Sequence, residues 1–460
     1  MLESPSQRTT AQWEDMRVFF TMLGQLAYGG LAQHSAILVK NLRDLGCEIL
    51  PVVGMAPPHN DEVPLADLHY TFDAFNVADY VLRDQPAPVR WLLAPYGRRK
   101  IARGHPRKLR SLSLPIGIDY KRLVERIFFK PNGSDLRKVD AQRRAFRPDI
   151  DYVCELSLAG YFRRFTDLGI PLVVAAQGYE VCQRHGIDVL SAIKQNQGMI
   201  DVVLSGSQAN VRENIARDLP FLLSRTRVVH YGIVNDETYD MPPAEAMQRA
   251  SRFVRPGNEF VVIALSRIDV EKGTDLALHA LRILLDQGQN VRLRLVGDSV
   301  AGGHFHSTIR DKIALMDLAE HVDYVGFVED KADKVALLKT SNAFLAPFIK
   351  SEPFGLVYCE AMAAGLPVIT PDSGAGPEII QWGGYKAGLV YRSQDTGAMA
   401  DAIRYLVAHP HEGKEMGEAG RRAVAEHFNA RRMAVDILHL FEEAIARKRA
   451  GARHHHAVSL

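Results

Sequence analysis

Cysteine is scarce in this sequence, and its spacing fits neither a cysteine-bound metal nor a disulfide framework. The 460 residues include four cysteines, Cys47, Cys154, Cys182 and Cys359, and none of them belongs to a C-x-x-C pair. Zinc-binding and disulfide-rich domains depend on closely spaced cysteines. The sequence therefore indicates neither class and favours a reducing compartment.

Long apolar runs are also missing. Nowhere do about 18 apolar residues follow one another, which is the length that a helix needs to span a membrane. Residues 1–17 are polar and include acids, whereas a signal peptide carries an apolar core. We therefore expect a cytoplasmic protein.

The sequence also lacks a large excess of charge of one sign. It contains 56 Lys and Arg and 54 Asp and Glu, which give a net charge of +2. This near neutrality excludes a uniformly basic nucleic-acid binder. The composition, 47% hydrophobic and 24% charged, excludes a disordered or fibrous chain. At about 100–200 residues per domain, the 460 residues predict two or three domains.

What is present is a repeated pattern of short apolar run, turn and amphipathic helix, which is typical of parallel α/β folds. The pattern occurs in two blocks, and each predicts one doubly wound, Rossmann-like unit. The first block begins with an expected strand at 17–22, a turn at Gly29 and Gly30, and a helix at 31–45. Further strands are expected at 151–154, 171–175, 201–204, 227–229, 259–265, 292–296, 322–325, 343–347, 367–370 and 388–391, and further helices at 274–287 and 307–319.

Composition also suggests where the domains end. We expect a first domain at 1–240, a polar, proline-containing linker at 241–257 and a second domain at 258–429. The last region, 430–460, is expected to hold a helix to about residue 449 that crosses back to the first domain. A disordered tail with three adjacent histidines is expected to follow that helix.

Two glutamates flank a glycine loop at the start of a short predicted helix, 356–364. Glu352 lies just outside the helix N-terminus, Glu360 lies one to two turns inside it, and Pro353 and Gly355 hold the loop. Free N–H groups and the positive end of the helix dipole make such an N-terminus a phosphate site. One carboxylate could then face a sugar while the other reaches a ribose. The alternative is structural, with one acid favouring the helix dipole and the other solvated.

Glu352 and Glu360, with Phe354, Gly355 and Leu356 between them, resemble the E-x7-E motif of retaining glycosyltransferases of family 4. The resemblance implies the GT-B fold, an α/β architecture of two Rossmann-like domains that face each other across a cleft. It also implies that Glu352 lies at the donor sugar, that the loop amides hold a diphosphate and that Glu360 binds the ribose. The nucleotide-diphosphate-sugar is then a substrate, and neither a cofactor nor a metal is expected.

Other positions match the family as well. Arg267 and Lys272 resemble its cation pair for the donor diphosphate, where fixed positive charge stabilises the leaving group. Each cation alone could be an ordinary surface charge. Gly29 and Gly30 resemble the family's glycine loop, with Gly30 assigned to the donor and Gly29 to the acceptor, although an ordinary tight turn explains them equally well. Phe327 falls where the family contacts the base.

Gln177 departs from the family pattern. Many members carry a histidine after the strand that corresponds to 171–176, whereas this sequence continues with Gln177 and Tyr179. We assign both residues to the acceptor side. Glutamine donates and accepts hydrogen bonds but does not titrate, so a role in proton transfer at this position is in doubt. Glu180 and His185 are alternatives for that role.

Other metal or cofactor motifs are weaker. Asp149 and Asp151 match the D-x-D motif of metal-dependent glycosyltransferases of another fold, and we expect that match to be coincidental. His304 and His306 lack a third ligand. No G-x-G-x-x-G follows either opening strand, which argues against a dehydrogenase.

Positive charge gathers in residues 90–147, which hold 17 Lys or Arg and four acids. The local charge of +13 leaves −11 for the rest of the chain. Within this segment, residues 120–130 predict a helix with cations on one stripe, which could lie on an anionic membrane or attract a lipid-linked glycan. The alternative is a core-packed helix with solvated cations. Without an aromatic platform, nucleic acid is not an expected partner.

Together these features predict a retaining, hexosyltransferase-type enzyme of cell-surface polysaccharide or glycolipid synthesis. The nucleotide-sugar donor is expected mainly on the second block and a glycan or lipid-linked acceptor on the first. Two alternatives stay open: a nucleotide-sugar 2-epimerase of the same fold and a non-catalytic nucleotide-binding subunit. If residues 90–147 bind an anionic surface, the protein works peripherally at the inner face of the membrane.

Overall fold

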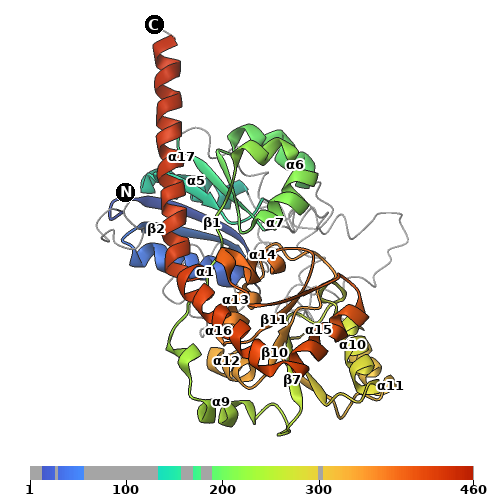
Figure 1. The fold of residues 1–460 in the computed structure, drawn as a ribbon. Helices are drawn as coiled ribbons and strands as arrows, with labels where there is room; N and C mark the ends of the chain where they lie inside the picture. Colours follow the sequence, from blue (N-terminus) through green and yellow to red (C-terminus); the bar gives the residue numbers. More distant parts are fainter. Residues whose placement is uncertain are drawn as a thin grey trace, which may run out of the picture. The chain divides into compact units, whose positions relative to one another are not determined.

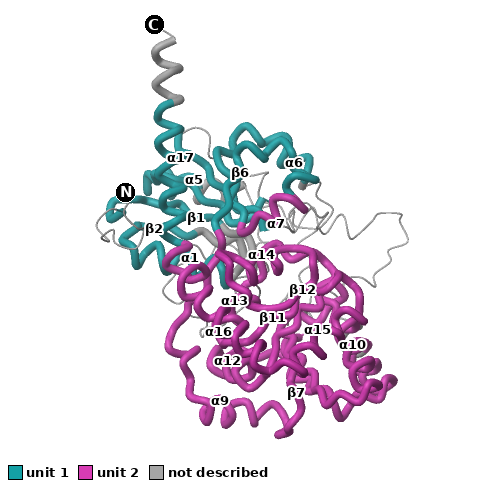
Figure 2. The backbone as a smooth tube through the Cα atoms, in the orientation of Figure 1, with its two compact units in different colours: residues 1–205, 215–229, 434–460 teal, residues 206–214, 230–433 magenta. Residues whose placement is uncertain are grey.

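The computed structural model describes residues 13–25, 30–55, 133–156, 169–177, 189–298 and 304–458 (Figure 1). The chain divides into two compact units, which are coloured separately in Figure 2. The first unit comprises residues 1–205, 215–229 and 434–460, and the second comprises residues 206–214 and 230–433.

A parallel sheet with the strand order β2-β1-β3-β4-β5-β6 forms the described core of the first unit. Val18 of β1 pairs with Ile49 of β2 on one side and with Ile150 of β3 on the other. Strands β3, β4 and β5 are buried along their whole length, as parallel strands covered on both faces are. The strands are β1 (Arg17–Gln25), β2 (Glu48–Met55), β3 (Ile150–Val153), β4 (Leu172–Ala176), β5 (Val202–Ser205) and β6 (Thr226–Val228). The helical segments are α1 (Gly30–Asp44), α5 (Gly133–Phe146), α6 (Val189–Asn196), η5 (Gln197–Met199), α8 (Ala216–Asp218) and η7 (Pro220–Arg225).

The last helix, α17 (Ala430–Val458), belongs to the first unit from Ala434 onward. The ring of Phe441 lies 5.8 Å from that of Tyr152 on β3. The predicted return of the C-terminal helix to the first domain is therefore confirmed. The expected disorder beyond residue 449 is wrong as far as Val458, because residues 446–453 are rich in the strong helix formers Ala, Arg and Lys.

The second unit contains a parallel sheet with the order β12-β11-β10-β7-β8-β9. Counted from β7, this is the 3-2-1-4-5-6 order of nucleotide-binding α/β sheets, and it reverses between β7 and β10. Ligands of such sheets bind at the carboxyl ends of the strands on either side of this switch point. The strands are β7 (Phe260–Leu265), β8 (Val291–Val296), β9 (Val322–Gly326), β10 (Ala343–Leu345), β11 (Val368–Pro371) and β12 (Gly388–Tyr391). The helical segments are α7 (Gln208–Asn210), η6 (Val211–Ile215, whose last residue belongs to the first unit), η8 (Glu237–Asp240), α9 (Pro243–Ala250), η9 (Val270–Lys272), α10 (Thr274–Asp286), α11 (His304–Leu315), α12 (Lys331–Lys339), α13 (Leu356–Ala363), α14 (Gly376–Ile380), η10 (Trp382–Gly384), α15 (Thr396–Ala408) and α16 (Pro410–Glu426).

The stretch 241–257, expected as a linker, lies within the second unit and contains α9. Pro242 is the N-cap of this helix and Pro243 its first residue, a position that needs no N–H and suits the fixed φ of proline. Ala246 packs with Met241 and with Ala336 of α12. The prolines that suggested a linker thus begin a helix. Within the described part of the chain, no helix combines the length and apolarity required to cross a membrane.

Candidate active site

Two groups of predicted donor residues lie at the switch point of the second sheet. Arg267 and Lys272 follow the carboxyl end of β7, and Glu352 follows that of β10. Asp269 fixes the first of these two loops, because its carboxylate accepts a hydrogen bond from the Lys272 amide at 3.0 Å and caps η9. The side chains of Lys272 and Glu352 therefore project from neighbouring, anchored loops.

Close backbone packing holds the two loops together. Gly273 has a φ of +64°, and a Cβ atom at this position would lie 1.8 Å from the carbonyl oxygen of Pro347. The Ile349 amide in turn donates to the Glu271 carbonyl at 3.0 Å. Only glycine permits this approach, so the contact between the two loops depends on Gly273.

Lys272 and Glu352 form an ion pair with 2.5 Å between Nζ and Oε2, and their side chains are 13% and 15% exposed. The same Nζ lies 4.5 Å from the centre of the Phe348 ring, which offers a second attraction for the cation. Arg267 is more open at 43% exposure and lies 3.0 Å from an oxygen of Asp269. The structure therefore brings the predicted cation and the predicted catalytic carboxylate into direct contact.

Helix α13 begins beside this pair with no side chain capping its N-terminus and no acid in its first turn. Its N-cap is Gly355, with a φ of +80°, where a Cβ would lie 2.9 Å from Cγ of Glu352. The backbone N–H groups that open the helix at Leu356 thus lie close to Glu352 and point along the helix axis, an arrangement suited to an anion.

Glu360 lies one turn further into α13 and is only 3% exposed. Lys334 of α12 approaches it with 2.7 Å between Nζ and Oε1. This acid is buried and paired, which rules out the alternative of a solvated glutamate on a surface helix.

The two aromatic residues predicted for the donor side differ in their surroundings. Phe354 is buried, and its ring lies 5.1 Å from Tyr231 and 6.2 Å from Phe428, so it anchors the loop through packing. Phe327 follows β9 and is 54% exposed, as a platform for a base would be.

Three residues absent from the predicted set support the site. The Ser207 hydroxyl donates to the Pro353 carbonyl at 2.5 Å. The Glu378 carboxylate accepts from the Gln208 and Ala209 amides at 2.9 and 2.8 Å, and it lies 2.8 Å from Nε2 of His230. Burial alone would raise the pKa of Glu378, but its hydrogen bonds to His230 and the two amides lower it. No sequence motif marks these residues, because their contacts span more than a hundred positions.

The acceptor-side predictions fall on the first unit. Gly29 and Tyr179 lie outside the described residues. Gly30, which was assigned to the donor, also belongs to the first unit and is the first residue of α1. Gln177 follows β4, and its amide donates to the Cys154 carbonyl at 3.3 Å. Gln177 therefore lies at the carboxyl end of β4 and bonds to the residue that follows β3.

The D-x-D pair has structural partners. Asp151 is fully buried on β3 and forms an ion pair with Arg143 of α5, while Asp149 accepts from the Arg17 amide at 3.0 Å. Burial is the main cause that raises the pKa of Asp151 to about 6, with Arg143 opposing it. Both carboxylates hold the first unit together, in line with the expected coincidence. His304 and His306 lie on the first turn of α11.

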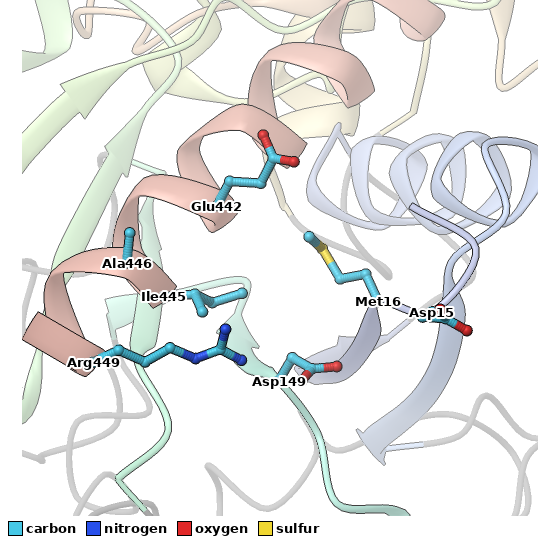
Figure 3. Close-up of a pocket in the computed structure, with 7 residues that line it drawn as sticks. All are labelled: Asp15, Met16, Asp149, Glu442, Ile445, Ala446 and Arg449. Carbon is cyan, nitrogen blue, oxygen red and sulfur yellow. The ribbon is translucent and has the colours of Figure 1, made fainter. Parts of the chain in front are cut away.

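A cavity of about 300 Å³ opens in the first unit (Figure 3). Met16 and Asp149 line it directly before β1 and β3 begin, so it lies at the amino ends of the strands. Ligands of parallel α/β sheets bind at the opposite ends, and the cavity is therefore not a candidate for the donor. The remaining lining residues are Asp15, Glu442, Ile445, Ala446 and Arg449.

Solved structures show which class of fold this is. The chain is similar to Anabaena Alr3699/HepE, solved in complex with UDP, with a TM-score of 0.65 and 17% identity over 93% of this chain and 100% of that one. It is also similar to sucrose-phosphate synthase from Thermosynechococcus elongatus, with a TM-score of 0.66 and 18% identity over 94% and 100% of the two chains. These neighbours and the two six-stranded parallel sheets in the described residues confirm the predicted GT-B fold.

Sequence comparisons also find a matching family model and similar proteins. Residues 248–423 match the family model described as "Glycosyl transferases group 1". Spore coat protein SA of Bacillus subtilis is 27% identical over 241 residues, 51% of this chain and 63% of that protein. The GDP-mannose-dependent alpha-(1-6)-phosphatidylinositol monomannoside mannosyltransferase of Mycolicibacterium smegmatis is 31% identical over 196 residues, 41% of this chain and 49% of that protein. These matches confirm the predicted resemblance to glycosyltransferases of family 4. The chain spans 63% and 49% of the length of these two curated relatives.

Proposed function

We propose that this chain is a retaining glycosyltransferase that moves a hexose from a nucleotide-diphosphate-sugar to a hydroxyl of a glycan or glycolipid. The observation that carries the proposal is the contact between Lys272 and Glu352 at the switch point, beside the uncapped N-terminus of α13. A cation and a carboxylate in contact beside free backbone amides suit a sugar that is attached to a diphosphate.

Each donor residue has a role in this proposal. Arg267 and Lys272 bind the diphosphate together with the amides that open α13 at Leu356. Glu360, held by Lys334, accepts hydrogen bonds from the ribose hydroxyls, and Phe327 stacks on the base. The ion pair with Lys334 fixes the position of the Glu360 carboxylate, as a specific hydrogen bond to a ribose requires.

The chemistry breaks the bond between the sugar's anomeric carbon and the diphosphate oxygen and forms a bond to the acceptor oxygen on the same face. The acceptor proton passes to the leaving phosphate oxygen. Lys272 and Arg267 stabilise the negative charge that grows on that phosphate, and Glu352 stabilises the positive charge on the sugar. The departing phosphate serves as the base, so no titrating residue is needed at Gln177.

Known relatives and neighbours support the donor class. One similar protein is a GDP-mannose-dependent mannosyltransferase, and one similar structure was solved with UDP-glucose. Another similar protein is the lipopolysaccharide core biosynthesis mannosyltransferase LpsB of Rhizobium meliloti, 34% identical over 151 residues. The similarity to these two mannosyltransferases supports a role in cell-surface polysaccharide or glycolipid synthesis.

A ligand screen tests this function. Thermal unfolding is followed with UDP, GDP and ADP and with their sugars, since a ligand that binds the folded state raises the unfolding midpoint. The donor found in this way is then incubated with and without acceptor glycans. Diphosphate release only with acceptor supports the transferase. Isomerised sugar without acceptor, or binding with neither reaction, contradicts it.

The basic segment 90–147 is proposed to hold the enzyme at an anionic membrane or its lipid-linked acceptor. Arg143 is excluded from this role, because it is buried against Asp151. Co-sedimentation with phosphatidylglycerol vesicles is expected to exceed that with phosphatidylcholine vesicles and to fall with added salt. Binding that ignores both lipid charge and salt contradicts the proposal.

A further inference from the structure

The loop that carries Glu352 is fastened by a carboxylate far away in the sequence. The Ser351 hydroxyl donates a hydrogen bond to Oε2 of Glu213, across 138 positions. The Gly374 amide donates to both oxygens of the same carboxylate at 3.1 Å, across 161 positions. Glu213 therefore ties the residue before Glu352 to a second loop, the one that follows β11.

This second loop also holds the backbone of Glu352. The Ala375 amide donates to the Glu352 carbonyl at 2.9 Å. Gly374 has a φ of +71°, and a Cβ atom there would lie 2.6 Å from the Glu352 nitrogen. Anything that shifts Gly374 will thus shift Glu352.

The segment that supplies Glu213 is itself anchored on both sides of Glu352. Ser207 bonds to the carbonyl of Pro353, the residue after Glu352, while Glu213 bonds to Ser351, the residue before it. Glu213 lies on the π-helical turn η6. Such turns are rare in proteins, and those that occur are often found at functional sites. Unlike Glu378, which accepts from the first two amides of α7, Glu213 accepts from the loop that carries Glu352 and from the loop that follows β11.

We propose that Glu213 is a positioning residue that sets where the Glu352 carboxylate meets the donor sugar. The inference rests on the proposed function. Glu213 makes its contacts to Ser351 and Gly374, and it acts on the reaction through the backbone of Glu352. A displacement of a catalytic group by about 1 Å can cost about a hundredfold in rate.

The kinetic test compares Glu213→Ala, Glu213→Gln and the control Glu245→Ala, which removes an exposed glutamate paired with Arg249 on α9. For Glu213→Ala we expect kcat to fall about tenfold to a hundredfold, with affinity for the nucleoside diphosphate changed by less than about threefold. Glu213→Gln should recover part of the rate, because its amide oxygen still accepts one hydrogen bond. Glu245→Ala should match the wild type. Wild-type kcat in Glu213→Ala, or parallel losses of kcat and diphosphate affinity, overturns the inference.

Hydrogen–deuterium exchange tests the same contacts without any turnover. Peptides covering residues 346–355 and 372–377 should exchange faster in Glu213→Ala than in the wild type, while the rest of the second unit is unchanged. Unchanged exchange in both peptides overturns the inference even if activity falls. A wild-type chain that transfers no sugar would instead count against the proposed function, and the exchange result would still decide the role of Glu213.

Discussion

The Nζ atom of Lys272 lies 2.5 Å from Oε2 of Glu352, although 80 positions separate the two residues. Their contact joins the loop after β7 to the loop after β10, the two strands between which the order of the sheet reverses. A lysine ammonium has three N–H donors. In the proposed function, Lys272 can therefore donate hydrogen bonds to the Glu352 carboxylate and to a phosphate oxygen at the same time. The lysine thereby connects the diphosphate of the donor to the carboxylate at its sugar.

Replacing Glu352 by Gln should nearly abolish transfer while leaving the fold intact. Glutamine keeps the size of the side chain and can still accept from Lys272, but it carries no charge to stabilise the sugar. We expect transfer to fall by about a hundredfold or more. Steady-state assays and thermal unfolding measure the two effects. Turnover equal to that of the wild type would remove the role assigned to Glu352.

Replacing Lys272 by Met should weaken nucleoside-diphosphate binding by about tenfold to a hundredfold, because hydrogen bonds to a charged group contribute about 1.5–3 kcal/mol. Isothermal titration calorimetry measures this affinity. The matched control is Lys312→Met, which removes a lysine that pairs with Asp275 at 3.3 Å on the outside of the same unit. Equal affinity in the two variants would mean that Lys272 does not bind the diphosphate.

The buried pair of Glu360 and Lys334 predicts a stability effect that depends on which partner is removed. Lys334→Met leaves the Glu360 charge without its partner and should lower the free energy of unfolding by about 3 kcal/mol. The double variant with Glu360→Gln should recover part of that loss, because no buried charge remains. Chemical denaturation of the wild type and of these two variants measures it. A double variant less stable than Lys334→Met would contradict this account of the pair.

Glu360 should also discriminate the ribose. Wild-type chain should bind a nucleoside diphosphate more tightly than its 2′,3′-dideoxy analogue, and Glu360→Gln should reduce this ratio about tenfold. A ratio that is the same in both proteins would assign Glu360 to structure alone.

His34 predicts how stability depends on pH. Burial in α1 lowers its pKa from 6.5 to about 3. Below pH 6.5 the unfolded chain therefore binds a proton that the folded chain does not, and the free energy of unfolding falls as the pH falls. The contribution is about 1.4 kcal/mol per pH unit, and it ends at about pH 3.

Denaturant unfolding between about pH 4.5 and 6.5 tests this slope. His34→Gln should flatten it, whereas His411→Gln should not, because His411 is 85% exposed. Equal slopes in both variants would contradict the assignment to His34.

Much of the fold could be predicted because local pattern and tertiary structure agree. The apolar runs at 171–175 and 201–204 correspond to β4 and β5, which are buried along their length. Where they disagree, local signals mislead. Pro242 and Pro243 suggested a linker but begin α9, since proline also suits the first turn of a helix. β2 was not predicted.

The site could be predicted only in part, for a physical reason. Lys272, Glu352 and Glu360 belong to short motifs, so their residue types and spacing are visible in one segment. Glu213 and Lys334 act through contacts between segments that the sheet order brings together, and nothing in their own neighbourhood marks them. A functional residue that acts through tertiary contacts can be identified only from the structure.

The measurement that tests the central claim most directly is transfer from an α-linked nucleotide-sugar identified by the ligand screen, with the product's anomeric configuration read by NMR. The account predicts an α-linked product formed by the wild type, release of the nucleoside diphosphate only when acceptor is present, and loss of both in Glu352→Gln. A β-linked product, or diphosphate release that is independent of the acceptor and unaffected by Glu352→Gln, would contradict it.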